Sequence, residues 1–347
     1  MVIVLLISII SFVLTVFCVK LSIKIGYKFE IIDTPGYRKI HKSPIPRSGG
    51  MAFFVSFFML VLFLILLKIY DFKILKGAYL SLIIIFLLGI YDDVKGANAK
   101  VKFLFQILSA SLLWYNGLRI DRITNPFGGE ILITNNVLSL VITVFWVVSL
   151  INAINLLDGM DGLAAGVILI SSVFIFIIAG LSKNIDVLFL ASMLIGITSG
   201  FLVFNFPPAK IFMGDTGSMF LGFMMAVLGI IGNRKSAVAI TLLVPIVLLL
   251  IPIIDTGMAI LRRLKQRKNI FQADKEHIHH RLLALGIGYK KVLLIIYMIN
   301  IYLGLIALLS LFFRKEYIFI LFIVLFLGIF ILLEILRFVE KKSKIKN

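Results

Sequence analysis

Long apolar segments recur along the whole chain, and short polar segments separate them. Each is about as long as an α-helix must be to cross roughly 30 Å of hydrocarbon. In lipid such a run must be helical, because its backbone polar groups find partners only within the segment. The pattern predicts eleven spans, near residues 2–20, 51–69, 77–91, 102–117, 137–154, 163–181, 185–204, 216–232, 236–260, 291–312 and 317–337.

The composition agrees with this pattern. Hydrophobic residues make up 61% of the 347 residues and charged residues only 15%, against about a quarter in soluble domains. We therefore expect an all-α polytopic membrane protein that forms a single domain over residues 1–347. The one cysteine, Cys18, excludes a disulfide framework and a cysteine metal site. One connector, 118–136, alternates apolar and polar positions around two glycines, which predicts a small β-hairpin on the outer side.

The distribution of positive charge predicts the orientation. Of the 35 Lys and Arg residues, 25 fall on one side of the membrane, which the positive-inside rule makes cytoplasmic. The segments of that side are 20–50, 92–102, 152–162, 205–215, 261–291 and the C-terminal tail. The N-terminus is then outside and the C-terminus inside a cytoplasmic (inner) membrane. The net charge of +18 reflects this topology and attraction to anionic lipids rather than to nucleic acid, for which no motif is present.

Unusual polar residues gather on the same side. Six carboxylates lie at the ends of spans or in connectors, and all four histidines lie in connectors. They are Asp92, Asp93, Asp158, Asp161, Asp215 and Asp255, with His41, His277, His279 and His280. A single acid at a helix end is usually a cap or a solvated residue, but scattered solvated charges would not segregate to one face. We therefore predict that the four inner connectors between residues 92 and 291 form one site.

The sequence NAINLLDGMDG (152–162) has an oxygen-bearing side chain at every third position: Asn152, Asn155, Asp158 and Asp161. On a helix this spacing puts neighbours on one side, and the two glycines predict that the last turn unwinds. Carboxamide and carboxylate oxygens suit a hard cation such as Mg²⁺. The alternative is a polar, glycine-rich turn between spans.

The adjacent Asp92 and Asp93 end the third predicted span. Like charges repel, and a divalent cation or a cationic substrate group would relieve the repulsion. The DDxxD pattern of prenyl-diphosphate enzymes is incomplete, because Gly96 stands at the position of the third acid. Asp215 opens a later apolar helix, where it would serve equally as a helix N-cap or as a metal ligand near phosphate oxygens.

The segment FQADKEHIHHRLLALGIG (271–288) holds three histidines and Arg281 within five residues. Because no cysteine accompanies them, a structural zinc site is the weaker interpretation. Basic residues upstream indicate that the loop binds anions, with docking on anionic lipid as the alternative. Carboxylates for Mg²⁺ and a cationic loop for phosphates are together what phosphoryl transfer needs. A site at the bilayer surface further indicates a lipid phosphate and a water-soluble nucleotide as substrates.

Five motifs occur in the order typical of one family. They are DTPGYRKIHKSPIPRSGG, YDDVKGANAKVKFLFQ, NAINLLDGMDGLAAG, FMGDTGSMFLG and DKEHIHHRL. Through them the chain resembles the polyprenyl-phosphate N-acetylhexosamine-1-phosphate transferases, and within these the undecaprenyl-phosphate GlcNAc-1-phosphate transferases of the WecA/TagO-like branch. The resemblance implies that undecaprenyl phosphate attacks the β-phosphorus of UDP-GlcNAc, that UMP leaves, and that Mg²⁺ (or Mn²⁺ in its place) bridges the diphosphate.

The resemblance also implies roles for individual residues. Asp92 is the better candidate of the aspartate pair to orient or deprotonate the lipid phosphate. The matching catalytic residues are Asp92, Asp93, Asp158, Asp161 and His279, the substrate-binding residues are Lys102, Asn152, His277, His280 and Arg281, and the metal ligands are Asn155 and Asp215.

Alternatives remain for the donor and for the class of protein. The loop has HIHH rather than the run of adjacent histidines of phospho-MurNAc-pentapeptide transferases, which favours a UDP-N-acetylhexosamine over UDP-MurNAc-pentapeptide. It supports UDP-GlcNAc and leaves another UDP-HexNAc open as the donor. Direct and covalent-intermediate mechanisms both fit. A transporter of polyprenyl-linked sugars would place its acids near the bilayer midplane, whereas these acids lie at the inner ends of spans. A homodimer is compatible with the sequence.

Overall fold

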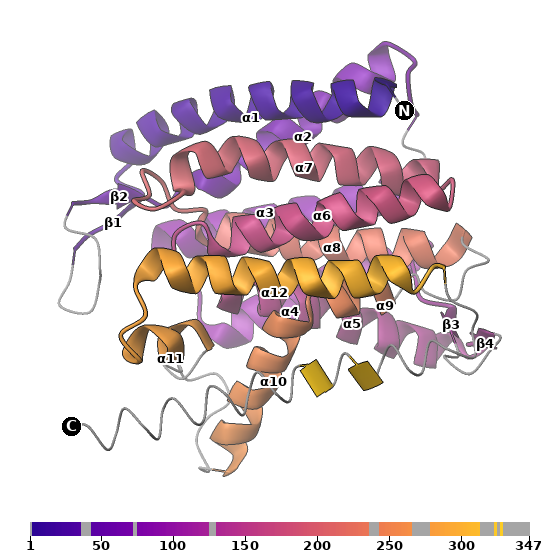
Figure 1. Ribbon diagram of the computed structural model, residues 1–347. Coiled ribbons are helices and arrows are strands. Elements are labelled where there is room, and N and C mark those ends of the chain that lie inside the picture. The colour runs from indigo at the N-terminus through magenta and orange to yellow at the C-terminus, as the bar shows by residue number, and fades with distance from the viewer. Residues whose placement is uncertain are drawn as a thin grey trace.

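The computed structural model describes residues 2–35, 43–71, 75–124, 130–235, 243–265, 278–312, 323–324 and 327–328. This part of the chain is mostly helical (Figure 1). Its helices are α1 (Val2–Lys28), α2 (Gly49–Leu66), α3 (Lys76–Lys95), α4 (Ala99–Tyr115), α5 (Asn136–Leu157), α6 (Leu163–Leu181), α7 (Ile185–Asn205), α8 (Gly214–Lys235), α9 (Leu243–Leu248), α10 (Leu250–Lys265), α11 (Ile278–Ala284) and α12 (Tyr289–Leu309).

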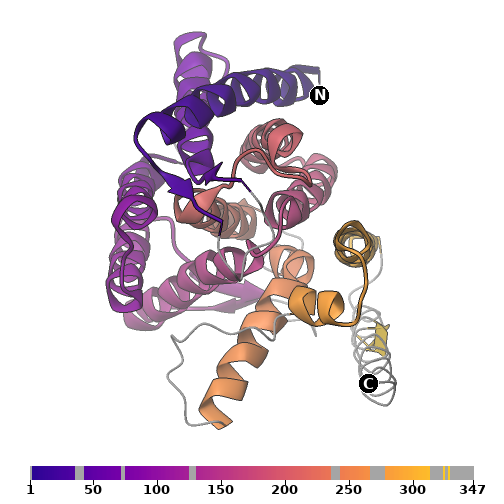
Figure 2. The same cartoon turned by 90° about the vertical axis from the view of Figure 1, so that its left-hand side faces the viewer.

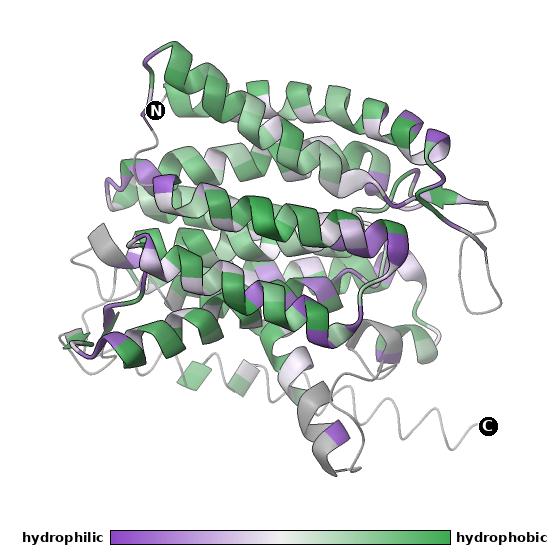
Figure 3. Ribbon diagram, turned by 180° about the vertical axis from the view of Figure 1, so that it is seen from behind, coloured by the Kyte–Doolittle hydropathy of each residue, from purple (hydrophilic) through white to green (hydrophobic). Residues whose placement is uncertain are grey.

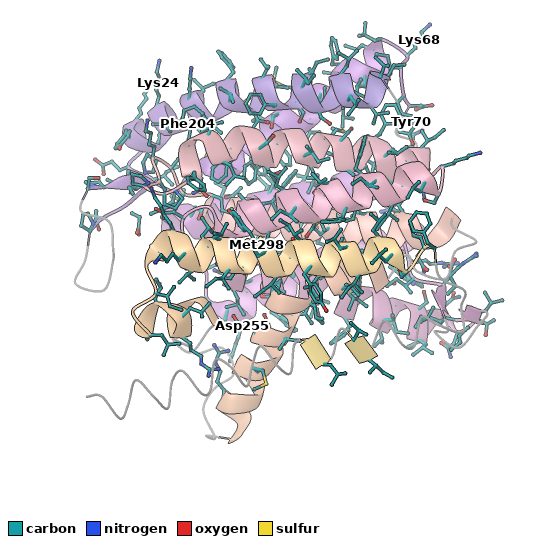
Figure 4. All side chains as sticks on the ribbon, in the orientation of Figure 1. Lys24, Lys68, Tyr70, Phe204, Asp255 and Met298 are labelled. Atoms are coloured by element: carbon teal, nitrogen blue, oxygen red, sulfur yellow. The ribbon has the colours of Figure 1, made fainter. Side chains whose placement is uncertain are left out.

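Eight of the described helices are long and apolar enough to cross a membrane: α1, α2, α3, α5, α6, α7, α8 and α12. Hydrophobic residues fill the middle of the bundle, and hydrophilic residues gather toward helix ends and connectors (Figure 3). Figure 4 marks the two ends, with Lys24 and Phe204 at one and Lys68 and Tyr70 at the other. The prediction of an all-α polytopic membrane protein is confirmed. The predicted span 317–337 lies almost wholly outside the described residues, so the count of eleven stays a prediction.

The helices near the predicted site extend further than the apolar runs. α3 carries Asp92 and Asp93 in its last turn, because the first residue to leave helical geometry is Gly96, with φ of +74°. The next helix, α4, begins directly after Asn98, whose side chain accepts hydrogen bonds from two backbone N–H groups of that helix. The predicted connector 92–102 is therefore much shorter than expected, and its acids stand on a rigid helix.

Two small antiparallel sheets lie near opposite ends of the bundle (Figure 1). β3 (Arg122–Thr124) pairs with β4 (Glu130–Leu132), with Ile123 opposite Ile131. This pairing confirms the predicted hairpin. β1 (Ile32–Asp33) pairs with β2 (Ile45–Pro46). The sequence did not predict this second sheet, because two-residue strands are too short to show an alternating pattern.

The prediction of one continuous helix over 236–260 is wrong. In the described part of this range α9 ends at Leu248, α10 begins at Leu250, and α10 projects away from the bundle (Figures 1 and 2). Pro252 accounts for the break, because it has no N–H to donate to the carbonyl of Leu248 four residues earlier. The Asn300 side chain of α12 donates to that carbonyl instead, at 2.5 Å.

The central helix is α8. Within its apolar part 94% of the residues are buried, against 33% in α1, and it packs against α2, α3 and α5. Glycines allow close approach of the neighbouring backbones. A Cβ added to Gly89 of α3 would lie 2.4 Å from the Cα of Thr216, and one added to Gly50 of α2 would lie 2.2 Å from the backbone N of Gly217. Small residues have this role where helices associate in membranes.

Gly89→Ala is expected to lower the melting temperature of the detergent-purified protein. The added methyl group overlaps the backbone of α8, and overpacking of this kind costs about 1–3 kcal/mol. Gly257→Ala is the matched control, since an added Cβ there meets no described atom within 4 Å. Equal melting temperatures for Gly89→Ala and the wild type would contradict the close packing of α3 on α8.

Candidate functional site

Polar side chains from three helices meet at the β1–β2 end of the bundle. Asp92 and Asp93 come from the last turn of α3, Asn155 from the last turn of α5, and Asp215 from the first turn of α8. Because α8 packs against both α3 and α5, residues far apart in the sequence become neighbours. The structure thus brings together most of the acids that the sequence predicted to share one site.

The Asp93 side chain is buried, and both of its oxygens are engaged by α8. Oδ1 accepts a hydrogen bond from the backbone N of Asp215 at 2.8 Å, and Oδ2 accepts from the backbone N and Oγ1 of Thr216 at 3.0 and 2.6 Å. The side chain is 1% exposed, and Nη2 of Arg47 lies 3.7 Å from Oδ1. Asp93 therefore caps the N-terminus of α8, where unpaired N–H groups and the helix dipole favour a carboxylate. The N-cap role considered for Asp215 belongs to Asp93 instead.

Asp92 points to different partners. Its Oδ1 accepts a hydrogen bond from the backbone N of Ala97 at 2.6 Å, and its Oδ2 lies 2.6 Å from the ammonium nitrogen of Lys102 on α4. The same ammonium donates to Oδ2 of Asp215. Two carboxylates from α3 and α8 thus converge on one positive charge. The adjacent aspartates therefore have separate protein partners, and the divalent cation or cationic substrate group that the sequence suggested beside them stays a prediction.

The two asparagines of the 152–162 ladder contact different helices. Asn152 donates to Oε1 of Gln106 on α4 at 2.7 Å, so it joins α5 to α4. Asn155 donates to Oγ of Ser218 on α8 at 2.9 Å and lies beside Asp215. Of the two, Asn155 is the one that borders the converging carboxylates.

The turn after α5 contains the other two acids of the ladder. Asp158 is the C-cap of α5, and Gly162 takes a left-handed conformation (φ +76°) before α6, so the helix unwinds as predicted. Burial and the neighbouring carboxylates of Asp215 and Asp93 raise the pKa of Asp158 to about 8. Asp158 is then mostly protonated at pH 7 unless a bound cation favours its ionised form.

Asp161 fastens this turn to the segment between α7 and α8. Its Oδ2 accepts a hydrogen bond from the backbone N of Ala209 at 3.0 Å. Next to it, the backbone N of Gly162 donates to Oδ1 of Asn205 at 2.9 Å, and the amide of Asn205 donates to the carbonyl of Ile211 at 2.8 Å. The turn and the segment leading into α8 are therefore held in one arrangement.

Two tyrosines of α12 also hold the turn, and sequence reasoning missed both. Tyr289 accepts a hydrogen bond from the backbone N of Asp161, and Tyr297 donates to the carbonyl of Gly162 at 2.5 Å. Tyrosine near the start of an apolar helix is typical of a membrane-interface anchor, so the sequence gives no separate signal for this contact. Because α12 follows closely after the histidine-containing segment, the tyrosines link that segment to the acidic turn.

The histidine-containing segment is only partly described. His41 and His277 lie outside the described residues, and of His279 and His280 only the backbone, in α11, is described. Arg281 is half-buried on the same helix, which packs against α12. The predicted contacts of this segment with phosphate and sugar stay predictions.

The donor set near Lys102 suits a magnesium ion. Among the described residues no group of three or more His, Cys, Asp or Glu side chains could hold a metal. Asp92 and Asp215 nevertheless direct carboxylate oxygens to one point, with the Asn155 carboxamide beside Asp215. Mg²⁺ usually keeps several waters and takes only one or two protein carboxylates. The site therefore fits Mg²⁺ at Asp215 and Asn155, whereas Asp92 pairs with Lys102 and both oxygens of Asp93 are engaged by α8.

Several known proteins are similar in sequence. Residues 75–233, which run from α3 to near the end of α8, match the family described as Glycosyl transferase family 4. The chain is 40% identical to the probable undecaprenyl-phosphate N-acetylglucosaminyl 1-phosphate transferase of Bacillus subtilis, over 81% of this chain and 76% of that one. It is 33% identical to the decaprenyl-phosphate N-acetylglucosaminephosphotransferase of Mycobacterium leprae, over 85% and 80%. It is 32% identical to the phospho-N-acetylmuramoyl-pentapeptide-transferase of Streptococcus pyogenes, over 64% and 71%.

Tyr289→Phe is expected to loosen the turn at Asp161. The variant removes the acceptor of the Asp161 backbone N–H, and a buried donor without a partner costs about 1–3 kcal/mol. Hydrogen–deuterium exchange of residues 158–163 in the purified protein should become faster. Tyr302→Phe, on the same helix and 39% exposed, is the control. Equally slow exchange of the turn in both variants would show that Tyr289 does not hold it.

Proposed function

The chain belongs to the polyprenyl-phosphate N-acetylglucosamine-1-phosphate transferases of glycosyl transferase family 4, and from this premise we propose the reaction that it catalyses. The protein transfers GlcNAc-1-phosphate from UDP-GlcNAc to undecaprenyl phosphate. The products are UMP and undecaprenyl-diphospho-GlcNAc, which is a first membrane intermediate for a cell-envelope glycan.

One observation supports this proposal above the others. Asp92 of α3 and Asp215 of α8 direct carboxylate oxygens at the same point, and the Lys102 ammonium lies there. Phosphoryl transfer uses both components, because carboxylates hold Mg²⁺ and a lysine contacts phosphate oxygens. The Asn155 carboxamide beside Asp215 adds an oxygen of the kind that Mg²⁺ accepts as a ligand.

In the proposed reaction an acceptor phosphate oxygen forms a bond to the β-phosphorus of the donor, and the bond from that phosphorus to the oxygen of UMP breaks. Mg²⁺, held by Asp215 and Asn155, would neutralise diphosphate oxygens. Lys102 leaves the carboxylates and contacts the diphosphate, where its charge offsets the negative charge that develops on UMP. Asp92, released from Lys102, orients the acceptor phosphate or accepts its proton.

The remaining predicted residues have places around this centre. Asp158 and Asp161, in the turn after α5, would lie on the nucleotide side, and Asn152 supports α4, which carries Lys102. The loop residues His277, His279, His280 and Arg281 would close on sugar and diphosphate. Anionic lipids and a second copy of the chain are proposed as further partners.

The position of the acids at helix ends supports an enzyme at the membrane surface over a transporter. A transporter binds its substrate near the bilayer midplane, whereas Asp92 lies in the last turn of α3 and Asp215 in the first turn of α8. The excess of Lys and Arg on this side supports the cytoplasmic face of the inner membrane. The acceptor phosphate is held at this depth by its polyprenyl tail.

Purified wild-type protein with undecaprenyl phosphate and Mg²⁺ is expected to release UMP from UDP-GlcNAc. UDP-GalNAc and UDP-MurNAc-pentapeptide run in parallel, because the similarity to a pentapeptide transferase makes the latter the second donor to test. EDTA should stop the reaction, and added Mg²⁺ or Mn²⁺ should restore it. UMP release from UDP-MurNAc-pentapeptide alone would overturn the donor assignment, and no release from any donor by folded protein would favour the transporter.

Lys102→Gln is expected to lower kcat/KM for UDP-GlcNAc at least about tenfold, or about 1.4 kcal/mol of transition-state stabilisation. The variant removes the charge that contacts the diphosphate and leaves Asp92 and Asp215 without their shared partner. Lys100→Gln, two residues earlier on the same helix and exposed, is the matched control. Equal kcat/KM in the two variants would argue against a role for Lys102 in the reaction.

A further inference from the structure

We propose that Arg47 is a phosphate-binding residue of this site, and that its guanidinium contacts phosphate oxygens of one of the two substrates. The inference rests on the proposed function and adds a cation to it. Arg47 lies between β2 and α2, in the first of the five family motifs, and sequence reasoning assigned this arginine no individual role.

The backbone of Arg47 is fixed against the chain that leads into α8. Just before it, the carbonyl of Pro46 accepts a hydrogen bond from the backbone N of Phe212 at 2.8 Å, and just after it Gly49 N donates to the carbonyl of Phe212 at 3.0 Å. A Cβ added to Gly214, the first residue of α8, would lie 2.4 Å from the carbonyl oxygen of Arg47. Arg47 is therefore preorganised beside the N-terminus of α8.

From this backbone the side chain extends between the buried acids and solvent. Nη2 lies 3.7 Å from Oδ1 of Asp93, and the Arg47 side chain is 36% exposed where that of Asp93 is 1% exposed. The positive charge of Arg47 also acts on Asp158 in the turn after α5. The guanidinium thus lies beside the ends of α3, α5 and α8, and its partial exposure lets a ligand reach it from solvent.

Neutralising Asp93 does not account for this arrangement. Asp93 already accepts three hydrogen bonds of 2.6–3.0 Å from the first residues of α8. The separation of 3.7 Å from Arg47 is too long for a hydrogen bond. Within the described part of the chain no hydrogen bond from the guanidinium is found, so its five N–H donors remain available to a ligand.

The charge of the site explains why that ligand is a phosphate. Both substrates bring phosphate groups into a space bordered by acids, and Lys102 already pairs with two of these acids. A second cation lowers the electrostatic cost of binding an anion there. Arginine suits phosphate binding because its planar guanidinium can donate hydrogen bonds to two phosphate oxygens at once.

Arg47→Gln in the full-length purified protein tests the inference. KM and kcat are measured for UDP-GlcNAc at saturating undecaprenyl phosphate, and for undecaprenyl phosphate at saturating UDP-GlcNAc. KM for one substrate is expected to rise at least about tenfold, and the substrate affected identifies the phosphate that Arg47 contacts. Arg47→Lys keeps the positive charge but lacks the planar guanidinium, so its KM should lie between that of Arg47→Gln and that of the wild type. Lys24→Gln, exposed toward the same end of the bundle, is the control.

Values of KM for both substrates within about twofold of the wild type would overturn the inference, even if kcat falls, because a merely structural arginine would give that result. The failure of the proposed function looks different, since the wild type itself would then release no UMP. In that case binding is measured directly. The rise in melting temperature that UDP-GlcNAc or undecaprenyl phosphate causes is compared between the wild type and Arg47→Gln. Equal rises in the wild type and Arg47→Gln would overturn phosphate binding by Arg47.

Discussion

The capping of α8 by Asp93 is the contact on which the rest of the site depends. A helix that begins inside a membrane bundle leaves its first N–H groups without partners. The carboxylate of Asp93 binds two of them and is 1% exposed. This contact fixes the end of α3 against the start of α8. The neighbouring residue on each helix, Asp92 and Asp215, is thereby directed toward Lys102.

Two adjacent aspartates therefore have different tasks. Asp93 is buried and caps α8, whereas Asp92 pairs with the ammonium of Lys102. Asp158 is a third acid near this point, and burial and nearby carboxylates raise its pKa to about 8. Acids held this closely favour a cation, and in the proposed reaction Lys102 and Arg47 contribute positive charge toward the phosphates of the substrates. The acids lie at helix ends rather than in the apolar middle of the bundle, which agrees with the proposal that the acceptor phosphate reacts at the membrane surface.

The sequence predicted the class of fold and the grouping of the acids, because both follow from local patterns of hydropathy and charge. It could not predict the capping by Asp93, whose partner lies 122 residues later. The contact between Tyr289 and Asp161 spans 128 residues and also left no local signal. The break between α9 and α10 was predictable, since Pro252 removes the hydrogen-bond donor for Leu248. Hydropathy alone concealed it, because both helices are apolar at the break.

Direct binding of Mn²⁺, followed by electron paramagnetic resonance during titration and displaced by Mg²⁺, tests the central claim that Asp215 and its neighbours hold a divalent cation. The wild type and Asp215→Asn are compared in detergent, without substrates, and Asp71→Asn, exposed after α2, serves as the control. We expect the wild type and Asp71→Asn to bind Mn²⁺ alike, and Asp215→Asn to bind at least about tenfold more weakly. Equal affinity in all three proteins would contradict the account.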